Sequence, residues 1–130
     1  MRVLITTPYP VWPESSGAAR RTLGIARALS ARGHEVTVLA AAGRPPRPGG
    51  RREPFRLRSY SARGRAGHFV NQLFSRALDA ALRKGQDLVL ASFPYQAYPL
   101  ARFCRHHRTP LVYDAHNVEA ERFASLGSPV

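Results

Sequence analysis

The residues best suited to chemistry lie close together near the end of the chain, in the sequence Asp114-Ala-His116-Asn117-Val-Glu119. They follow the apolar run Leu111-Val-Tyr113, which we interpret as a buried strand. Polar side chains at the end of a buried strand cost free energy to desolvate unless they are paired or used. A histidine in that place can hydrogen-bond a sugar hydroxyl or a phosphate oxygen, or act as a base. His116 is therefore our candidate catalytic residue, and Asp114, Asn117 and Glu119 are candidates for lining a cleft.

A structural interpretation of the same segment stays open. Asn117 could simply cap a helix whose first turn carries Glu119, since both residue types suit a helix start. A metal site would need more ligands, and Cys104, His106 and His107 stand a whole strand length away along the chain. We therefore expect no metal and no cofactor.

A second candidate site lies where the first helix begins. Ser15 or Ser16 can cap a helix that runs to about Ala31. The free N–H groups and the dipole of a helix start attract anions, and Gly17 would let a ligand approach the backbone closely. Ser16 and Gly17 are therefore candidates for binding a phosphate, with Arg20 as a cleft candidate beside them. The alternative is that the serine is only the cap that any helix needs.

Two common classes of nucleotide-binding protein are disfavoured. The chain has neither GxGxxG nor GxxxxGK[ST], and the second predicted strand ends in Ala40-Ala41-Ala42-Gly43 without an acidic residue to hold a ribose. Neither a nicotinamide-dependent dehydrogenase nor a P-loop nucleotidase fits this pattern.

Strands and helices that alternate along the chain would position these residues. Apolar runs predict strands at about 2–6, 35–41, 55–59, 87–92 and 111–113, and helical periodicity predicts helices at about 15–31, 68–84 and 96–107. The helix at 68–84 should bury one wide face, made of Phe69, Val70, Leu73, Phe74, Ala77, Leu78, Ala81 and Leu82. Phe55 and Leu57 alternate with arginines, which is typical of an edge strand with one wet face. The sequence predicts an α/β fold: a doubly wound, mainly parallel, Rossmann-like sheet.

Length, charge and cysteine content limit the size of the core and the cellular compartment that we expect for this domain. The 130 residues suffice for one core, and 20 Lys+Arg against 8 Asp+Glu give a net charge of +12. The single cysteine, Cys104, rules out an internal disulfide, so we expect a small buried side chain and a reducing, cytoplasmic compartment. No apolar run approaches the length of a membrane span.

Residues 44–65 form an Arg-, Pro- and Gly-rich stretch that we expect to be a variable loop within the domain. Charge runs are usually solvated, which is the simplest interpretation. Peripheral contact with an anionic membrane is the sharper alternative. Nucleic acid is disfavoured, because the stretch lacks aromatic residues beyond Phe55 and Tyr60.

Five stretches in order carry a resemblance to a known family: Val3-Leu-Ile-Thr-Thr-Pro-Tyr-Pro10, Ser16-Gly17-Ala-Ala-Arg20, Leu29-Ser-Ala-Arg-Gly-His-Glu-Val-Thr-Val38, Asp87-Leu-Val-Leu-Ala91 and Leu111-Val-Tyr-Asp-Ala-His-Asn-Val-Glu119. Together they resemble the N-terminal, acceptor-side domain of GT-B glycosyltransferases, specifically the large retaining group called family 4. The resemblance covers nearly the whole chain except the Arg-rich middle. Many members have two glycines at the helix entry, where this chain has Ser16-Gly17.

The resemblance implies a nucleotide-sugar donor, an acceptor of unknown class (glycan, lipid or small molecule) and no bound metal. The Gly17 backbone would approach the donor diphosphate, and His116 would face the transferred sugar. Acceptor contacts would fall in the loops after Thr6 and around 44–65. Such enzymes bind most of the donor through a second Rossmann-like domain, so we expect residues 1–130 to be an incomplete domain that needs a C-terminal donor-binding domain in cis or in trans.

Two other functions remain open on the sequence. One is a freestanding α/β module that binds a phosphorylated small molecule at the same helix start. The other is a basic adaptor that uses the region from Arg44 to Arg65 to bind a membrane or nucleic acid.

Overall fold

The structure is a computed structural model, and it describes residues 1–43, 52–62 and 71–115. Five parallel strands pair in the order β3-β2-β1-β4-β5. The strands are β1 (Arg2–Thr7), β2 (Glu35–Ala41), β3 (Arg56–Tyr60), β4 (Leu88–Ala91) and β5 (Leu111–Tyr113). The helices are α1 (Gly17–Ala31), α2 (Gln72–Leu82) and α3 (Ala97–His106), with a short 3-10 turn, η2 (Pro94–Gln96), before α3. The predicted α/β, Rossmann-like fold is confirmed.

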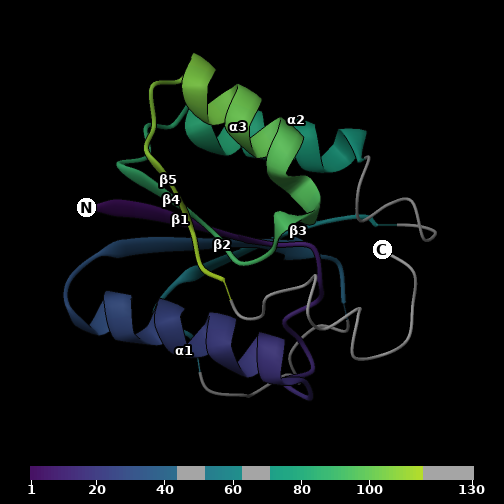
Figure 1. Cartoon of the computed structure of the whole chain (residues 1–130). Helices are drawn as coiled ribbons and strands as arrows, with labels where there is room; N and C mark the ends of the chain where they lie inside the picture. The colour runs from purple at the N-terminus through teal and green to yellow at the C-terminus, as the bar shows by residue number, and fades with distance from the viewer. Residues whose placement is uncertain (44–51, 63–70, 116–130) are drawn as a thin grey trace.

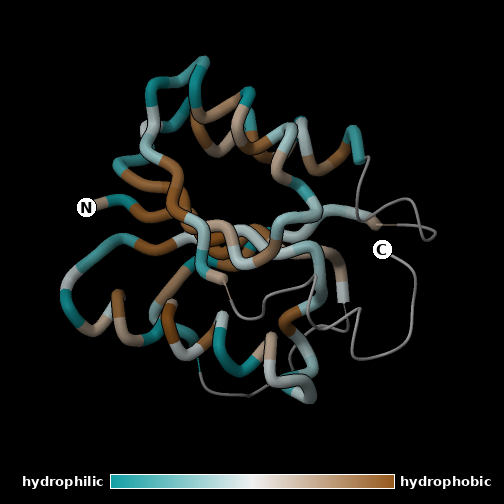
Figure 2. Tube along the Cα trace, in the orientation of Figure 1, coloured by the Kyte–Doolittle hydropathy of each residue, from teal (hydrophilic) through white to brown (hydrophobic). Residues whose placement is uncertain are grey.

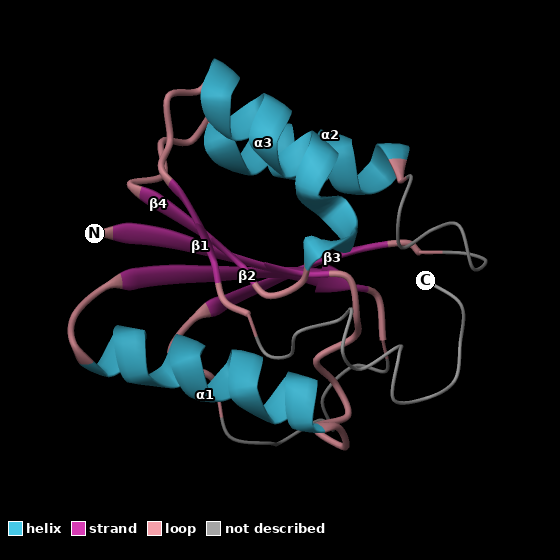
Figure 3. Cartoon of the chain, in the orientation of Figure 1, coloured by secondary structure: helices cyan, strands magenta, loops and turns pink. Residues whose placement is uncertain are grey.

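The elements form three layers. Helix α1 covers one face of the sheet, while α2 and α3 cover the other (Figures 1 and 3). Each face has its own core: Val3, Ile5, Val36 and Val38 meet Leu23 and Ala26 of α1 on one side. Leu4, Leu39 and Val89 meet Phe74 and Leu78 of α2 and Leu100 of α3 on the other. Apolar colour is accordingly concentrated in the central strands (Figure 2). Strands buried on both faces explain the nearly continuous apolar runs of the sequence.

Helix α1 begins and ends as the sequence predicts. The Ser16 Oγ accepts a hydrogen bond from the Ala19 N–H at 3.1 Å, which makes Ser16 the N-cap. After the helix, Gly33 takes a φ of +82°, and its N–H donates to the Ser30 carbonyl. A glycine is needed there because other residues rarely adopt the left-handed region.

Helix α2 is shorter than predicted. It begins at Gln72 rather than at His68, because the Asn71 side chain caps it by accepting from the N–H groups of Leu73 and Phe74 at 2.9 and 3.0 Å. The predicted apolar face is confirmed for Phe74, Leu78, Ala81 and Leu82, which are buried. Leu73 contradicts it with 48% exposure. Phe69 and Val70 lie outside the described residues.

The predicted burial of strand β5 is also wrong. The sequence predicts a buried strand, but Leu111, Val112 and Tyr113 are 38%, 47% and 48% exposed. The reason is its position at one end of the sheet, paired only with β4 among the described strands. An apolar run does not distinguish a central strand from an edge strand.

Strand β3 forms the opposite edge, as predicted. Phe55 and Leu57 pack partly buried on the α1 side, while Arg56 and Arg58 alternate with them and are exposed. The strand lies within the stretch that the sequence predicts to be a variable loop. No helix among the described residues is long and apolar enough to cross a membrane.

Candidate functional site

The carboxyl edge of the sheet has the geometry of a ligand site. Strands β1 and β4 are neighbours, yet the chain leaves β1 toward α1 on one face and leaves β4 toward α3 on the other (Figure 1). Ligands of open α/β sheets bind in the crevice that such diverging connections create. Thr7 and Ser92 stand at the ends of these two strands, with the Ser92 N–H donating to the Thr6 carbonyl at 3.0 Å.

The start of α1 presents free donors at this edge. The Ser16 hydroxyl accepts from the Ala19 N–H. The N–H groups of Gly17 and Ala18, in contrast, have no hydrogen-bond partner among the described residues. Gly17 is exposed, and a Cβ built there would meet nothing within 4 Å. The first turn carries no acidic residue. This helix start can therefore accept an anion without rearranging its surroundings.

An ion pair joins the start of α1 to the end of β5. The Nε and Nη2 of Arg21 donate to the two carboxylate oxygens of Asp114 at 2.9 and 2.6 Å. The hydrogen bonds that Arg21 donates to Asp114 raise the pKa of Arg21 above its usual value. The Asp114 N–H donates to the Ala91 carbonyl, so the residue is fixed to β4 as well. Asp114 therefore holds the point at which the chain leaves β5.

A second arginine anchors the loop between β1 and α1. Arg27 uses Nη1 and Nη2 to bind both oxygens of Glu14 at 3.1 Å, and Nε and Nη2 to bind Glu53 at 3.1 and 2.7 Å. The hydrogen bond to Glu53, followed by the one to Glu14, raises the pKa of Arg27 above its usual value. Glu14 is thereby neutralised, which removes the negative charge closest in sequence to the start of α1.

Three aromatic rings join the loops that follow β1 and β4. Tyr9 meets Phe93 edge to face, with ring centroids 5.0 Å apart, and meets Tyr95 in the same way at 6.3 Å. Phe93 and Tyr95 stack at 5.9 Å. Such pairs favour a fixed relative position of the rings. The two loops bordering the crevice are held together.

A buried hydrogen-bond chain lies beside them. The Tyr60 hydroxyl donates to the Thr7 carbonyl at 3.2 Å and accepts from Gln96 Nε2 at 2.7 Å. Burial raises the pKa of Tyr60 to about 12, so the phenol stays neutral and keeps donating at physiological pH. This chain connects β3, the end of β1 and η2.

Comparison with known proteins decides the family. The model of the glycosyl transferase 4-like domain matches residues 16–129. This chain belongs to that family. No curated protein sequence matches it.

Two solved structures resemble the glycosyltransferase domain. The C-terminal domain of a hydrogenase from Pyrococcus furiosus has a TM-score of 0.57 at 17% identity, over 88% of this chain and 91% of that one. A universal stress protein family member from Burkholderia pseudomallei has a TM-score of 0.44 at 15% identity, over 87% and 94% of the two chains. At such identity the first likeness concerns the fold alone, and the second is too weak to carry an argument.

The structure brings some of the predicted site residues of this glycosyltransferase domain to one edge. Ser16, Gly17 and Asp114 all lie there. Arg20 is exposed, and it is the next residue, Arg21, that reaches Asp114. His116, Asn117 and Glu119 lie outside the described residues. Within the ranges described, no three of His, Cys, Asp and Glu gather as metal ligands. Cys104 is buried as predicted, and burial raises its thiol pKa to about 11.

Sequence reasoning missed three features of this edge. Arg21 was indistinguishable from Arg20, because both are basic residues of the first helical turns. The pairing of Tyr60 with Gln96 spans 36 residues and has no local pattern. The aromatic cluster could have been suspected, since Tyr9, Phe93 and Tyr95 each follow an apolar strand next to a proline.

Proposed function

We propose that this chain is the acceptor-side domain of a retaining GT-B glycosyltransferase, which moves a sugar from a nucleotide-sugar donor to an acceptor hydroxyl. The observation that carries the proposal is the open start of α1 at the carboxyl edge of the sheet, where the N–H groups of Gly17 and Ala18 have no partner in the described part of the chain. Membership of the glycosyl transferase 4-like family supports it.

The donor diphosphate would bind at this helix start. Its oxygens would accept from the Gly17 and Ala18 N–H groups, where the positive end of the helix dipole also favours negative charge. During transfer the bond between the sugar and the diphosphate breaks, a bond to the acceptor oxygen forms, and the proton of the acceptor hydroxyl passes to an oxygen of the leaving diphosphate. Charge grows on the leaving diphosphate, so donors fixed in advance at α1 stabilise it more in the transition state than in the ground state.

The ion pair of Arg21 with Asp114 would serve this site in two ways. It neutralises a carboxylate that would otherwise repel the diphosphate. It also fixes the exit of β5 two residues before His116, the residue that we propose faces the transferred sugar. Positioning of this kind is the main source of catalysis when no covalent chemistry falls to the protein.

The loops after β1 and β4, joined through Tyr9 and Phe93, would contact the acceptor. The domain would work without a metal and with a donor-binding domain supplied in cis or in trans. Peripheral contact with an anionic membrane on the cytoplasmic side would suit a lipid acceptor and the net charge of +12.

Turnover and binding assays on the 130-residue chain test the proposal. With UDP-glucose and GDP-mannose as probes, we expect saturable binding of at least one nucleotide sugar and negligible nucleotide release, because we propose that most donor contacts come from a separate donor-binding domain. Robust turnover by this chain alone would overturn the need for a donor-binding domain. Tight binding without turnover under every combination of acceptor and added domain would favour the freestanding binding module instead.

A further inference from the structure

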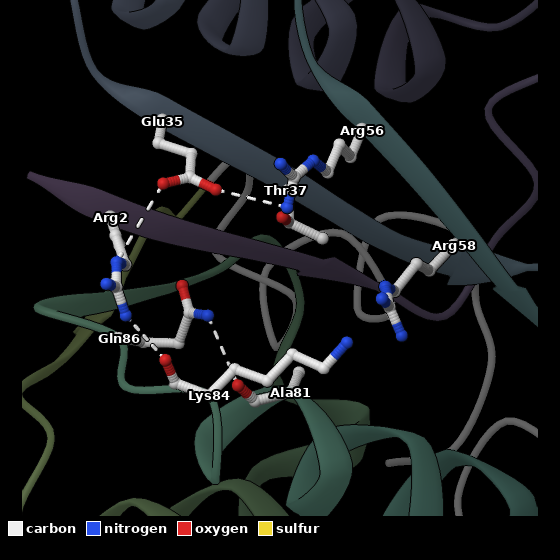
Figure 4. Close-up of a pocket in the computed structure, with 8 residues that line it drawn as sticks. All are labelled: Arg2, Glu35, Thr37, Arg56, Arg58, Ala81, Lys84 and Gln86. Atoms are coloured by element: carbon white, nitrogen blue, oxygen red, sulfur yellow. Dashed lines mark hydrogen bonds and ion pairs between the residues drawn. The ribbon is translucent and has the colours of Figure 1, made fainter.

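A separate basic pocket lies at the opposite, amino-terminal edge of the sheet. It has a volume of about 210 Å³ and is open to solvent beside the end of α2 (Figure 4). Its lining residues come from the starts of β1, β2 and β3 and from the end of α2 and the turn after it: Arg2, Glu35, Thr37, Arg56, Arg58, Ala81, Lys84 and Gln86.

Strand register explains why polar residues gather here. Arg2 pairs with Glu35 across β1 and β2, and Thr37 pairs with Arg56 across β2 and β3. Alternate residues share one face of a sheet, so these side chains continue the face whose carboxyl half is the core under α2. Helix α2 ends at Leu82 and leaves this corner uncovered. The sequence places Arg, Glu and Thr at the positions that would be aliphatic under a longer helix.

Positive charge dominates the pocket. It contains the cations Arg2, Arg56, Arg58 and Lys84 against the single carboxylate of Glu35. Glu35 lies 3.1 Å from Arg56 and 3.8 Å from Arg2. Neither Arg58 nor Lys84 forms an ion pair with any residue that the structure describes. Figure 4 shows both side chains lining the same space, Arg58 from β3 and Lys84 from the turn after α2.

Arg2 is held in place at the side of the pocket. Its Nη1 donates to the carbonyls of Lys84 and Gly85 at 2.5 and 3.1 Å, and its backbone N–H donates to Asp87 at 2.7 Å. The carbonyls at a helix end carry partial negative charge, which would disfavour an anion nearby. Arg2 offsets that charge and leaves the corner net positive.

We propose that this pocket binds a compact, multiply charged phosphate group. A planar guanidinium matches phosphate oxygens, and a lysine adds a point charge, so Arg58 with Lys84 is suited to phosphate. Liquid water occupies about 30 Å³ per molecule, so a pocket of 210 Å³ holds a phosphate or diphosphate with part of its hydration. The site stands at the edge of the sheet opposite to Gly17 and does not depend on the proposed transferase activity.

Calorimetric titration with inorganic pyrophosphate tests the proposal. All proteins carry Gly17→Ala, which should weaken any binding at the start of α1. We expect binding that weakens about tenfold or more in Arg58→Gln/Lys84→Gln, since hydrogen bonds to charged groups are being removed, and that declines as salt is raised. The matched control is Arg102→Gln/Arg105→Gln, which removes two exposed charges of α3 and should leave binding unchanged. The substituted residues are all exposed, so each variant should fold.

A second arm identifies the source of the phosphate. The same variants are sedimented with phosphatidylcholine vesicles that do or do not contain phosphatidic acid. Pocket-dependent binding of pyrophosphate assigns a free phosphorylated molecule. Pocket-dependent binding of phosphatidic acid vesicles without pyrophosphate binding assigns a lipid headgroup. Equal losses in the pocket variant and the α3 control, or no binding in either arm, would overturn the proposal.

Discussion

Arg21 binds both carboxylate oxygens of Asp114, and this pair joins the first turns of α1 to the end of β5 across 93 positions of sequence. Asp114 is only 15% exposed in its side chain, although half of the Arg21 side chain is open to solvent. The two segments that the sequence singles out for chemistry thus meet through one ion pair. The relation between the phosphate candidate Gly17 and the segment leading to His116 depends on it.

Replacing Arg21 should loosen the end of β5 without unfolding the domain. In Arg21→Gln the Asp114 amide should exchange its hydrogen about two- to fivefold faster, because exposed ion pairs contribute modestly to local order. Arg21→Lys should recover only part of the protection, since lysine cannot form the bidentate contact. Hydrogen exchange followed by NMR measures both. Arg20→Gln is the matched control, because it removes the neighbouring charge. Equally faster exchange of the Asp114 amide in this control would contradict the role of the ion pair between Arg21 and Asp114.

Removing the Tyr60 hydroxyl should destabilise the carboxyl edge. Tyr60→Phe leaves the Thr7 carbonyl and the Gln96 amide without their partner, which typically costs about 1–3 kcal/mol when the groups are buried. Urea unfolding measures the loss. Tyr98→Phe is the control because Tyr98 is 76% exposed, and equal stabilities of the two variants would show that the buried chain contributes nothing.

Gly43 should tolerate no side chain. A Cβ at this position would overlap the Trp12 carbonyl oxygen and would lie 2.6 Å from Pro10 Cβ. Gly43→Ala should therefore lower the free energy of unfolding by about 1–3 kcal/mol, as overpacking usually does. Gly24→Ala, in open space within α1, should raise it by about 0.5–1 kcal/mol. Chemical denaturation measures the free energy of unfolding of both variants. Changes of the same sign in the two variants would contradict this account.

Stability should depend on acid pH through Asp79, which joins α2 to the end of α3. The hydrogen bond with His107 at 2.8 Å, followed by the one from Arg83 at 2.9 Å, holds the pKa of Asp79 below its usual value. A lowered native pKa stabilises the fold above the unfolded carboxyl pKa of about 3.9, and the stabilisation is lost as pH falls through the native value.

Asp79→Asn should therefore be less stable than the natural chain at neutral pH, and the difference should vanish in acid. Thermal unfolding across the acid range measures this. Arg83→Gln should have the smaller effect, since that side chain is 73% exposed. A difference between Asp79→Asn and the natural chain that persists undiminished in acid would contradict the assignment.

Much of the fold follows from local pattern. The aliphatic run Val3-Leu-Ile5 and its counterparts predict parallel strands buried on both faces, and Ser16 and Gly33 mark the two ends of α1. The apolar residues before Asn71 predict a start of α2 that is too early, although Asn71 itself is a capping signal in the sequence. The sequence predicts a buried strand at Leu111–Tyr113 because the composition of this run matches that of β4.

The long-range features could not be predicted in the same way. Successive helical residues point about 100° apart, and nothing local to α1 says that Arg21, not Arg20, faces Asp114. The basic pocket depends on the register of Arg2 with Glu35 and of Thr37 with Arg56. Pairing register is a property of the assembled sheet.

Nucleotide-sugar binding by Gly17→Ala tests the central claim most directly. The start of α1 has room for the added methyl group, and alanine suits a helix better than glycine, so the variant should fold with equal or greater stability. The same methyl group would stand where we propose that the donor diphosphate approaches the backbone. Gly24→Ala makes the same change on the same helix away from its start.

Calorimetry with UDP-glucose and GDP-mannose compares the two variants with the natural chain. The account predicts that at least one of these sugar nucleotides binds the natural chain and Gly24→Ala equally, and binds Gly17→Ala about tenfold or more weakly, as expected when a close hydrogen bond to a charged group is blocked. Equal affinity for Gly17→Ala and the natural chain, with both folded, would contradict the placement of the donor at the start of α1.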